Sequence, residues 1–454
     1  MKAFCFFLLS LMTLQAATSE TLTMPEGGWP RQGSLLLEFS LPDIPGTLRA
    51  VPEFTDGYFG GRVFELPFVE ARLWTSRVRG RTSRSGINFN VLTTDGTRKM
   101  QQLSLSRLDG DKRYQLIYTW DADADTVSTF LQGIAQSDLG HWGADAAPMA
   151  ASPEGGGRLG GDILAGGERV TRLTVHRAEL FDRVLSEAEA AELARDLPPL
   201  SGEGRTVYTR TLDLEGVALR SVFDSDFSEP LDLTREEHLL DGDTRVRLPD
   251  TEWVLEGPNA SVETVADGLR LTTSAPEDRR DGHIVLWNTR EMPADFLFEY
   301  SFSPQNDERG LGIVFFNTRN PNGDTIFDLE LPPRFGRFRE YIVGAIDSYH
   351  VSPWATDDTT PRRTANMRKN SGFMLVAVGN DVIGGSGVGP HTVRILKRGG
   401  HVQVESIGVL ALEYRDDGVS HGPVHERPGL IGLRFMAHSE AVTVHRMRVW
   451  EVEE

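Results

Sequence analysis

One stretch of the chain alternates strictly between large apolar side chains and other residues. Phe296, Phe298, Tyr300 and Phe302 recur at every second position, with Leu297, Glu299 and Ser301 between them. A period of two is typical of a β-strand that buries one face. Helical periodicity is nearly absent elsewhere, and short apolar runs follow one another between Gly-rich turns. This pattern predicts an all-β protein built from sandwiches or jelly rolls.

Other strands of the second half follow from the same signal. Residues 311–316 are almost continuously apolar, and the turn Lys397-Arg-Gly-Gly-His401 joins two apolar runs as a hairpin. In the last strand the apolar phase changes between Val444 and Met447. A phase change inside one strand predicts a β-bulge.

The length of 454 residues exceeds what one hydrophobic core usually holds. Residues 198–204 read Pro-Pro-Leu-Ser-Gly-Glu-Gly, a composition typical of a linker. We therefore predict a first domain over 20–197, a linker over 198–221 and a second domain over 222–454. Ser186 and Glu189 have the spacing of a capping box ahead of an apolar stripe, so one short helix is expected to close the first domain.

The first nineteen residues have the features of a signal peptide. Lys2 supplies the positive start, residues 4–14 are an apolar run too short to span a bilayer, and Ala17 lies at a plausible cleavage site. We predict an exported protein, secreted or periplasmic, with no membrane span. The single cysteine, Cys5, lies in this segment, so the mature chain is expected to contain no thiol.

The net charge of −19 disfavours binding to nucleic acid, because a phosphate backbone attracts basic surfaces. The basic cluster from Arg362 to Lys369 stands out against this acidic background.

Two resemblances cover most of the chain. The segment Phe181-Asp-Arg-Val-Leu-Ser-Glu-Ala-Glu189 resembles the closing strand and helix of laminin-G-like, concanavalin A-like jelly rolls. Residues 222–452 resemble the bacterial family called domain of unknown function 1961, the YesU-like proteins, through Ser348-Tyr-His-Val-Ser, Asn366-Met-Arg-Lys-Asn-Ser-Gly-Phe, Ile284-Val-Leu-Trp-Asn and Gly312-Ile-Val-Phe-Phe. The resemblances imply two concanavalin A-like jelly-roll sandwiches in tandem and an association with acidic polysaccharides.

The candidate site lies between Gly344 and Gly372, where polar and aromatic groups are dense. Such groups suit a polar, anionic, ring-shaped ligand, because arginine offers a forked donor and histidine exchanges protons near neutral pH. As catalytic residues we predict His350 and Tyr349, although neighbours on a strand face opposite sides unless the backbone bends. As substrate-binding residues we predict Arg368, Asn366, Lys369, Trp354 and Trp287.

The favoured function is lyase-type elimination on an acidic or modified polysaccharide or oligosaccharide. Arg368 and Asn366 would neutralise the uronate carboxylate, His350 would remove a proton and Tyr349 would protonate the leaving oxygen.

Three alternatives stay open. The first is a non-catalytic, lectin-like glycan-binding protein, and the second is a structural adhesion module. The third is a glycoside hydrolase that uses Asp328 and Glu330, if these carboxylates alternate on a strand. No cofactor is expected, with calcium at Asp121, Asp123 and Asp125 as the one open option.

Overall fold

The structure is a computed structural model that describes residues 21–453 except 24, 27, 42–56, 79–80, 107, 109–111, 137–146, 151–153, 166–167, 276–282, 308, 343, 345, 358–359 and 437–439. The expected signal peptide, residues 1–19, and Cys5 lie outside the described residues. The chain divides into two compact units, one ending at Leu200 and the other running from Ser201 to Glu454, with residues 76–84 and 105–107 grouped with the second unit.

The first unit is one curled antiparallel sheet. Its strand order is β6-β5-β4-β3-β11-β12-β2-β7-β8-β9, and β1 and β10 extend it beside β3. The strands are β1 Thr21–Leu22, β2 Gln32–Ser40, β3 Gly57–Leu66, β4 Val69–Val78, β5 Arg81–Leu92, β6 Arg98–Leu105, β7 Tyr114–Asp121, β8 Thr126–Leu131, β9 Ile134–Ala135, β10 Gly157–Leu159, β11 Gly161–Ala165 and β12 Glu168–Phe181.

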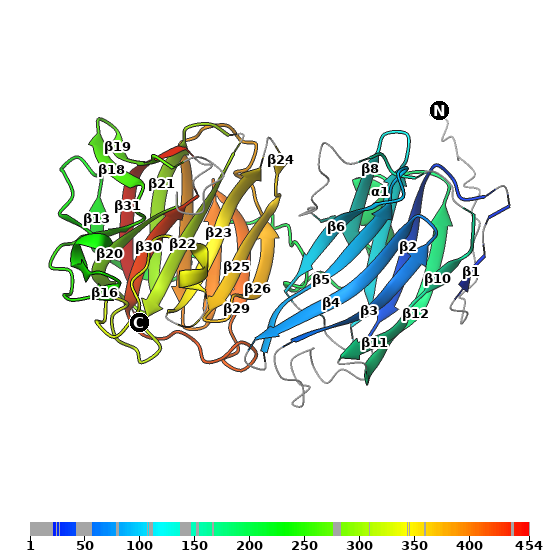
Figure 1. Cartoon of the computed structure of the whole chain (residues 1–454), viewed down its shortest axis with the longest axis horizontal. Helices are drawn as coiled ribbons and strands as arrows, with labels where there is room; N and C mark the ends of the chain where they lie inside the picture. Colours follow the sequence, from blue (N-terminus) through cyan, green and yellow to red (C-terminus); the bar gives the residue numbers. More distant parts are fainter. Residues whose placement is uncertain are drawn as a thin grey trace. The chain divides into compact units, whose positions relative to one another are not determined.

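Aromatic contacts show that this sheet folds over itself. Phe89 of β5 stacks on Tyr118 of β7 with 5.0 Å between ring centroids, although five strands separate β5 from β7 in the sheet order. Neighbouring strands lie about 4.8 Å apart, so a flat sheet would keep these rings far from each other. The first unit is therefore a two-layer sandwich (Figure 1).

A single short helix packs against this sandwich. Helix α1 (Glu187–Leu193) begins after Ser186, whose side chain accepts a hydrogen bond from the Glu189 backbone while the Glu189 carboxylate returns one. Ala190 and Leu185 bury their side chains against Leu36 and Ile117 of the sheet. The predicted capping box and closing helix are confirmed, and α1 is the only α-helix among the described residues.

The second unit is a sandwich of two sheets. The nine-stranded sheet has the order β14-β17-β20-β30-β22-β23-β25-β26, with β24 on β23, and the eight-stranded sheet has the order β18-β19-β31-β21-β27-β28-β29, with β13 on β31. The nine strands are β14 Leu233–Arg235, β17 Trp253–Glu256, β20 Ile284–Met292, β22 Gly310–Arg319, β23 Asp347–Asp357, β24 Thr360–Pro361, β25 Thr364–Asn370, β26 Met374–Asn380 and β30 Gly429–Phe435. The eight are β13 Ala218–Ser225, β18 Ala260–Val265, β19 Gly268–Thr273, β21 Phe296–Pro304, β27 His391–Arg398, β28 His401–Ser406, β29 Val409–Arg415 and β31 Ala441–Glu453.

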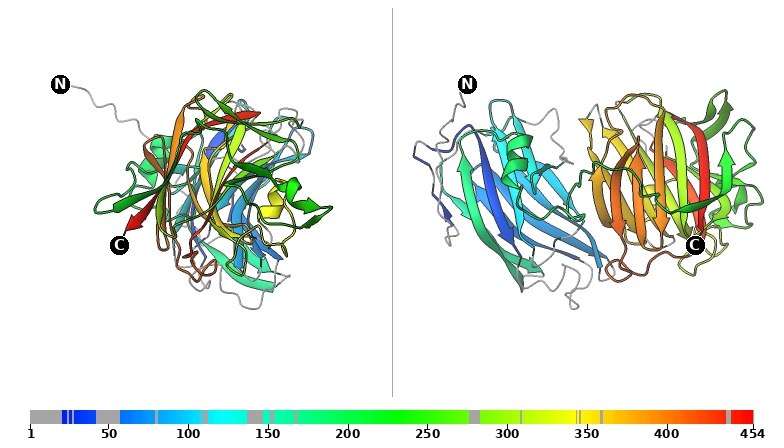
Figure 2. Two further views of the ribbon diagram at one scale, coloured as in Figure 1. Left: turned by 90° about the vertical axis from the view of Figure 1, so that its left-hand side faces the viewer. Right: turned by 180° about the vertical axis from the view of Figure 1, so that it is seen from behind.

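Smaller elements complete this unit. A two-stranded ribbon is formed by β15 Leu240–Asp241 and β16 Thr244–Arg245. The described residues also include the 3-10 helices η1 Glu236–Leu239 and η3 Phe338–Tyr341. Strand β13 begins at Ala218, inside the segment expected to be a linker. Figure 2 shows the eight-stranded sheet from behind, with β31 in red and β27 to β29 in orange tones.

The main core lies between the two sheets. Phe296, Phe298, Tyr300 and Phe302 point into it from β21, so the predicted alternation is confirmed. The hairpin of β27 and β28 forms as predicted, and the pairing register of β31 shifts beside Val444, where a bulge was expected. The predicted fold class, two all-β concanavalin A-like jelly-roll sandwiches with one short helix closing the first, is confirmed.

The other face of the nine-stranded sheet is covered as well. We call it the outer face, because its side chains point away from the main core. Val285, Trp287, Ile313 and Phe315 of this face form a second apolar cluster with Ile326, Phe327, Tyr341 and Ile346. The segment 324–346, with the yellow turn of η3, therefore lies over the sheet (Figure 1).

Among the described residues, no helix is long and apolar enough to cross a membrane.

Candidate functional site

Strands β23 and β25 place the predicted site residues on two opposite faces. Tyr349 pairs with Lys369, His350 with Arg368 and Ser352 with Asn366 in a regular antiparallel register. Paired residues share a face, and neighbours along a strand alternate. His350, Arg368 and Asn366 therefore lie on the outer face, whereas Tyr349 and Lys369 point to the inner side.

His350 is enclosed by aromatic rings. Its ring lies 5.3 Å from Phe315, 5.9 Å from Phe338 and 6.0 Å from Phe373, measured between centroids. Burial, together with the positive charges of Arg368 and Arg434, holds the pKa of His350 well below its usual value. The imidazole is therefore neutral at neutral pH.

The orientation of the Asn370 amide in the structure indicates the tautomer of His350. The Asn370 amide nitrogen Nδ2 lies 2.9 Å from His350 Nδ1 and also donates to Ser348 Oγ at 3.0 Å. An amide nitrogen is only a donor, so Nδ1 accepts and the ring hydrogen is on Nε2. The second ring nitrogen of His350 is thus a hydrogen-bond donor rather than a base.

Arg434 is a fully buried cation on the same face. The inner residues Ile431, Leu433 and Phe435 of β30 alternate with Arg434, whose guanidinium carbon lies 4.7 Å from the Phe338 ring. Its Nε and Nη2 have no hydrogen-bond partner among the described residues, and Nη1 reaches only the Met436 sulfur at 3.2 Å. Burial lowers the pKa of Arg434 to about 10, which still leaves the group charged at neutral pH.

Arg368 adds a second, partly exposed cation. Its guanidinium carbon lies 3.8 Å from the centroid of the Phe373 ring, and Nη1 donates to the Phe373 carbonyl at 3.1 Å. Phe373 has a φ of 54°, a left-handed conformation that is strained for a bulky residue. We call His350, Arg368 and Arg434, with Phe338 and Phe373, the cationic cluster.

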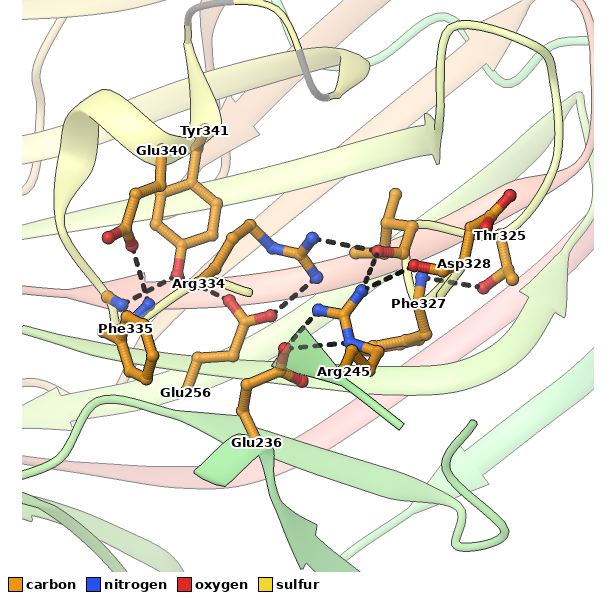
Figure 3. Close-up of polar contacts among 12 residues, drawn as sticks. Glu236, Arg245, Glu256, Thr325, Phe327, Asp328, Arg334, Phe335, Glu340 and Tyr341 are labelled. Atoms are coloured by element: carbon orange, nitrogen blue, oxygen red, sulfur yellow. Dashed lines mark hydrogen bonds and ion pairs between the residues drawn. The ribbon is translucent and has the colours of Figure 1, made fainter. Parts of the chain in front are cut away.

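A buried ion network holds the covering segment over this face (Figure 3). Arg334 donates to Glu256 Oε1 at 2.7 Å and to the Ile326 carbonyl at 2.9 Å, and the Tyr341 hydroxyl donates to Glu256 Oε2 at 2.5 Å. Burial and the Glu256 charge raise the pKa of Tyr341 well above its usual value, so this phenol keeps its proton. The network ties η3, and with it Phe338, to strand β17.

A second buried pair extends the network. Arg245 binds Glu236, with neither side chain exposed to solvent, and donates to the Asp328 carbonyl at 2.9 Å. Because Arg245 holds the segment through its backbone carbonyls, we assign this pair to the positioning of the segment.

Four predicted site residues do not lie where a ligand-binding role requires. Tyr349 is buried in the main core, and its hydroxyl donates to Asp416, which also binds Lys369. Trp354 packs in the same core against Phe302. Trp287 is sealed on the outer face between Phe315 and Tyr341, over Gly432, where any side chain would strike the indole. Neither tryptophan offers an open platform for a sugar ring.

The carboxylates predicted as candidates for a hydrolase site or a calcium site make hydrogen bonds and ion pairs within the protein. Asp328 lies outside the strands and accepts a hydrogen bond from the Glu330 backbone at 2.9 Å, so the strand alternation expected for Asp328 and Glu330 is wrong. Asp121 caps the turn after β7, while Asp123 binds Arg31 and Asp125 binds Lys99. The described residues contain no group of three or more His, Cys, Asp or Glu able to hold a metal ion.

Sequence reasoning missed Arg434, Phe338 and Phe373. Arg434 interrupts an otherwise apolar strand, residues 429–435, and this is the signal that could have found it. A strand that is apolar on both faces is covered on both faces. A single arginine in such a strand is therefore a buried charge.

Comparisons with known proteins match the second unit of the chain. Residues 243–446 match the family described as Domain of unknown function (DUF1961). The uncharacterized protein YesU of Bacillus subtilis (strain 168) is 32% identical over 195 residues, which cover 42% of this chain and 86% of that protein. The chain belongs to the DUF1961 family. The DUF1961 match includes every residue of the cationic cluster and the whole covering segment.

Several solved structures are similar to parts of the chain. A Bacillus subtilis protein of unknown function with a galectin-like fold is 24% identical, with a TM-score of 0.41, over 52% of this DUF1961 chain and 100% of that one. The carbohydrate-binding module CBM66 from Bacillus subtilis is 10% identical, with a TM-score of 0.27. The match covers 43% of this chain and 92% of that one. The exoplasmic/lumenal domain of VIP36 in its Ca²⁺/Man3GlcNAc-bound form is 12% identical, with a TM-score of 0.31. The match covers 45% of this chain and 85% of that one.

Proposed function

We propose that this chain is an exported carbohydrate-active protein whose C-terminal sandwich binds an acidic sugar unit of a polysaccharide or oligosaccharide at the cationic cluster. The observation that carries the proposal is the Arg434 guanidinium, which is buried with two unpartnered nitrogen atoms. An unpaired buried charge is strongly unfavourable, so the site is incomplete without an anion. A carboxylate or sulfate group satisfies both nitrogen atoms at once, because it matches the guanidinium fork.

The neighbouring groups suit the same anion. Arg368 contributes a second positive charge, and His350 contributes an Nε2–H donor. The three groups are donors or cations, and none of them attracts a proton from the ligand. This composition favours binding of an anion over proton abstraction.

The ring of Phe338 covers the Arg434 guanidinium, where the anion would bind. It is partly exposed and lies against the Arg434 guanidinium. An incoming carboxylate therefore displaces this ring, while the Arg334–Glu256 pair keeps the rest of the covering segment in place.

The elimination reaction expected from the sequence stays a prediction, and its assigned roles need revision. Tyr349 and His350 lie on opposite faces of β23, so they cannot act as acid and base on one substrate. Incubation with polygalacturonate and alginate, followed by the ultraviolet absorbance of unsaturated uronates, tests for elimination independently of binding.

Isothermal titration with polygalacturonate, alginate, a sulfated polysaccharide and uncharged dextran tests the binding proposal. We expect at least one acidic polymer to bind, with an affinity that falls as salt increases. The Arg434→Met variant should lose this binding, and the matched variant of an exposed arginine, Arg290→Met, should keep it. Equal binding by both variants contradicts the proposal.

Export is part of the proposal and rests on the N-terminal sequence pattern. Expression of the full chain in a bacterial host, followed by N-terminal sequencing of the mature protein, tests it. A mature N-terminus near residue 20 in the exported fraction supports export, whereas an intact Met1 in the cytoplasmic fraction contradicts it.

A further inference from the structure

A cavity of roughly 300 Å³ lies beside the ends of β22 and β23. Its lining includes Asn317, Asn320, Gly323, Asp347, His425 and Arg427. None of these residues belongs to the cluster, and the volume is in the range of small-molecule sites. This cavity is therefore a separate candidate for a ligand.

Two lining residues each have one buried polar atom without a partner among the described residues: Asn317 Oδ1 and His425 Nε2. The orientation of the Asn317 amide is fixed by chemistry, because Nδ2 donates to the carbonyls of Ala294 and Arg427, each at 3.1 Å. The atom left over is an acceptor. Asn317 also has a φ of 47°, at the irregular end of β22.

The loop that carries His425 is anchored by Tyr349 and Lys369, two residues that the sequence motifs had suggested for catalysis and substrate binding. The His425 backbone nitrogen donates to the Tyr349 hydroxyl at 3.3 Å, and the two rings meet edge to face at 4.7 Å. Lys369 Nζ binds Asp416 and donates to the Gly422 carbonyl at 2.8 Å. Tyr349 and Lys369 are therefore positioning residues for this loop.

The charge of the lining is balanced. The lining contains two acidic residues, Asp347 and Glu426, and two basic residues, Arg319 and Arg427. Burial and the nearby Lys369 charge lower the pKa of His425 to about 4, so the imidazole is neutral at neutral pH. A carboxylate or sulfate group has only acceptor atoms and cannot satisfy Asn317 Oδ1. A hydroxyl group can donate to this oxygen, and a second hydroxyl can pair with the imidazole.

We infer that this cavity is a binding site for one uncharged sugar unit, held through adjacent hydroxyl groups by Asn317 Oδ1 and His425 Nε2. The cavity lining shares no residue with the anion site at Arg434, so each site can be altered separately. An acidic glycan that carries neutral sugars would offer a ligand to each.

Ligand-observed NMR with glucose, galactose, mannose, xylose, fucose and rhamnose tests the inference on the full chain. At least one sugar should bind, and His425→Phe should weaken its binding about tenfold, because this change keeps the ring against Tyr349 and removes the nitrogen atom. The matched His445→Phe variant alters a histidine outside the cavity and should bind as the parent does. Absence of binding by every sugar, or equal affinity in His425→Phe, overturns the inference.

A crystal of the parent protein soaked in the tightest-binding sugar gives a second, variant-free readout. We expect the sugar ring in the cavity, with a hydroxyl beside Asn317 Oδ1, and a ring bound elsewhere overturns the inference. Failure here and failure of the acidic-glycan proposal are distinguishable. His425→Phe should still bind the acidic polymer, and Arg434→Met should still bind the neutral sugar.

Discussion

Replacing Arg434 with methionine should move stability and binding in opposite directions. Methionine keeps the length and apolar stem of arginine but removes the charge and both unpartnered nitrogen atoms. Replacement of buried charged groups by apolar ones of similar volume is often neutral or stabilising by about 1–4 kcal/mol. Because Arg434 has no ion-pair partner in the described residues, we expect the free energy of unfolding to rise within that range.

Binding should fall in the same variant. Loss of a buried, charge-assisted hydrogen bond to an anion costs at least about 2 kcal/mol, which is roughly 30-fold in Kd. Urea unfolding measures the first effect and titration with the acidic polymer the second. A variant that is less stable than the parent and binds the polymer equally well would refute the reasoning, because Arg434 would then be a structural residue. Arg290→Met should change neither quantity.

Three further outcomes follow from buried groups. Burial lowers the pKa of His350, so the unfolded chain takes up a proton at this residue near pH 6.5 while the folded chain does not. The contribution of His350 to stability is therefore full above pH 6.5 and falls as the pH drops, by up to about 1.4 kcal/mol per pH unit. Urea unfolding at several pH values should show a flatter slope for His350→Asn. Glu256→Gln leaves Arg334 charged without its partner, so we expect a loss of about 3–5 kcal/mol and faster hydrogen exchange over 324–342, whereas the exposed Glu252→Gln should alter neither. Tyr349→Phe removes the hydrogen bond to Asp416 and should lower the free energy of unfolding by about 1.5–3 kcal/mol without changing the affinity for the acidic polymer. Loss of that affinity with unchanged stability would instead show that Tyr349 contacts the anion.

Local sequence patterns predicted the parts of the fold that depend on local chemistry. The alternation at 296–302 identified strand β21 and its buried face, and the Ser186–Glu189 spacing identified the start of α1. The same period of two also indicated that Tyr349 and His350 face opposite sides. These features are set by backbone geometry within a few residues, and for that reason a single sequence contains them.

The covering segment could not be predicted in this way. Its residues are held by the Glu256–Arg334 ion pair and by a hydrogen bond from Arg245 to the Asp328 carbonyl, contacts across about 80 positions that no local pattern encodes. This cover seals Trp287 and His350 and turns an apparent sugar platform into a buried cluster. Arg434 was missed for the same reason, because its burial depends on Phe338 of the segment.

A crystal structure with a galacturonate trisaccharide tests the central claim most directly. We predict a carboxylate of the sugar within about 3 Å of Arg434 Nε and Nη2, with the Phe338 ring moved off the guanidinium. A trisaccharide bound elsewhere, with Arg434 still covered by Phe338 and still without an anion, would contradict the assignment.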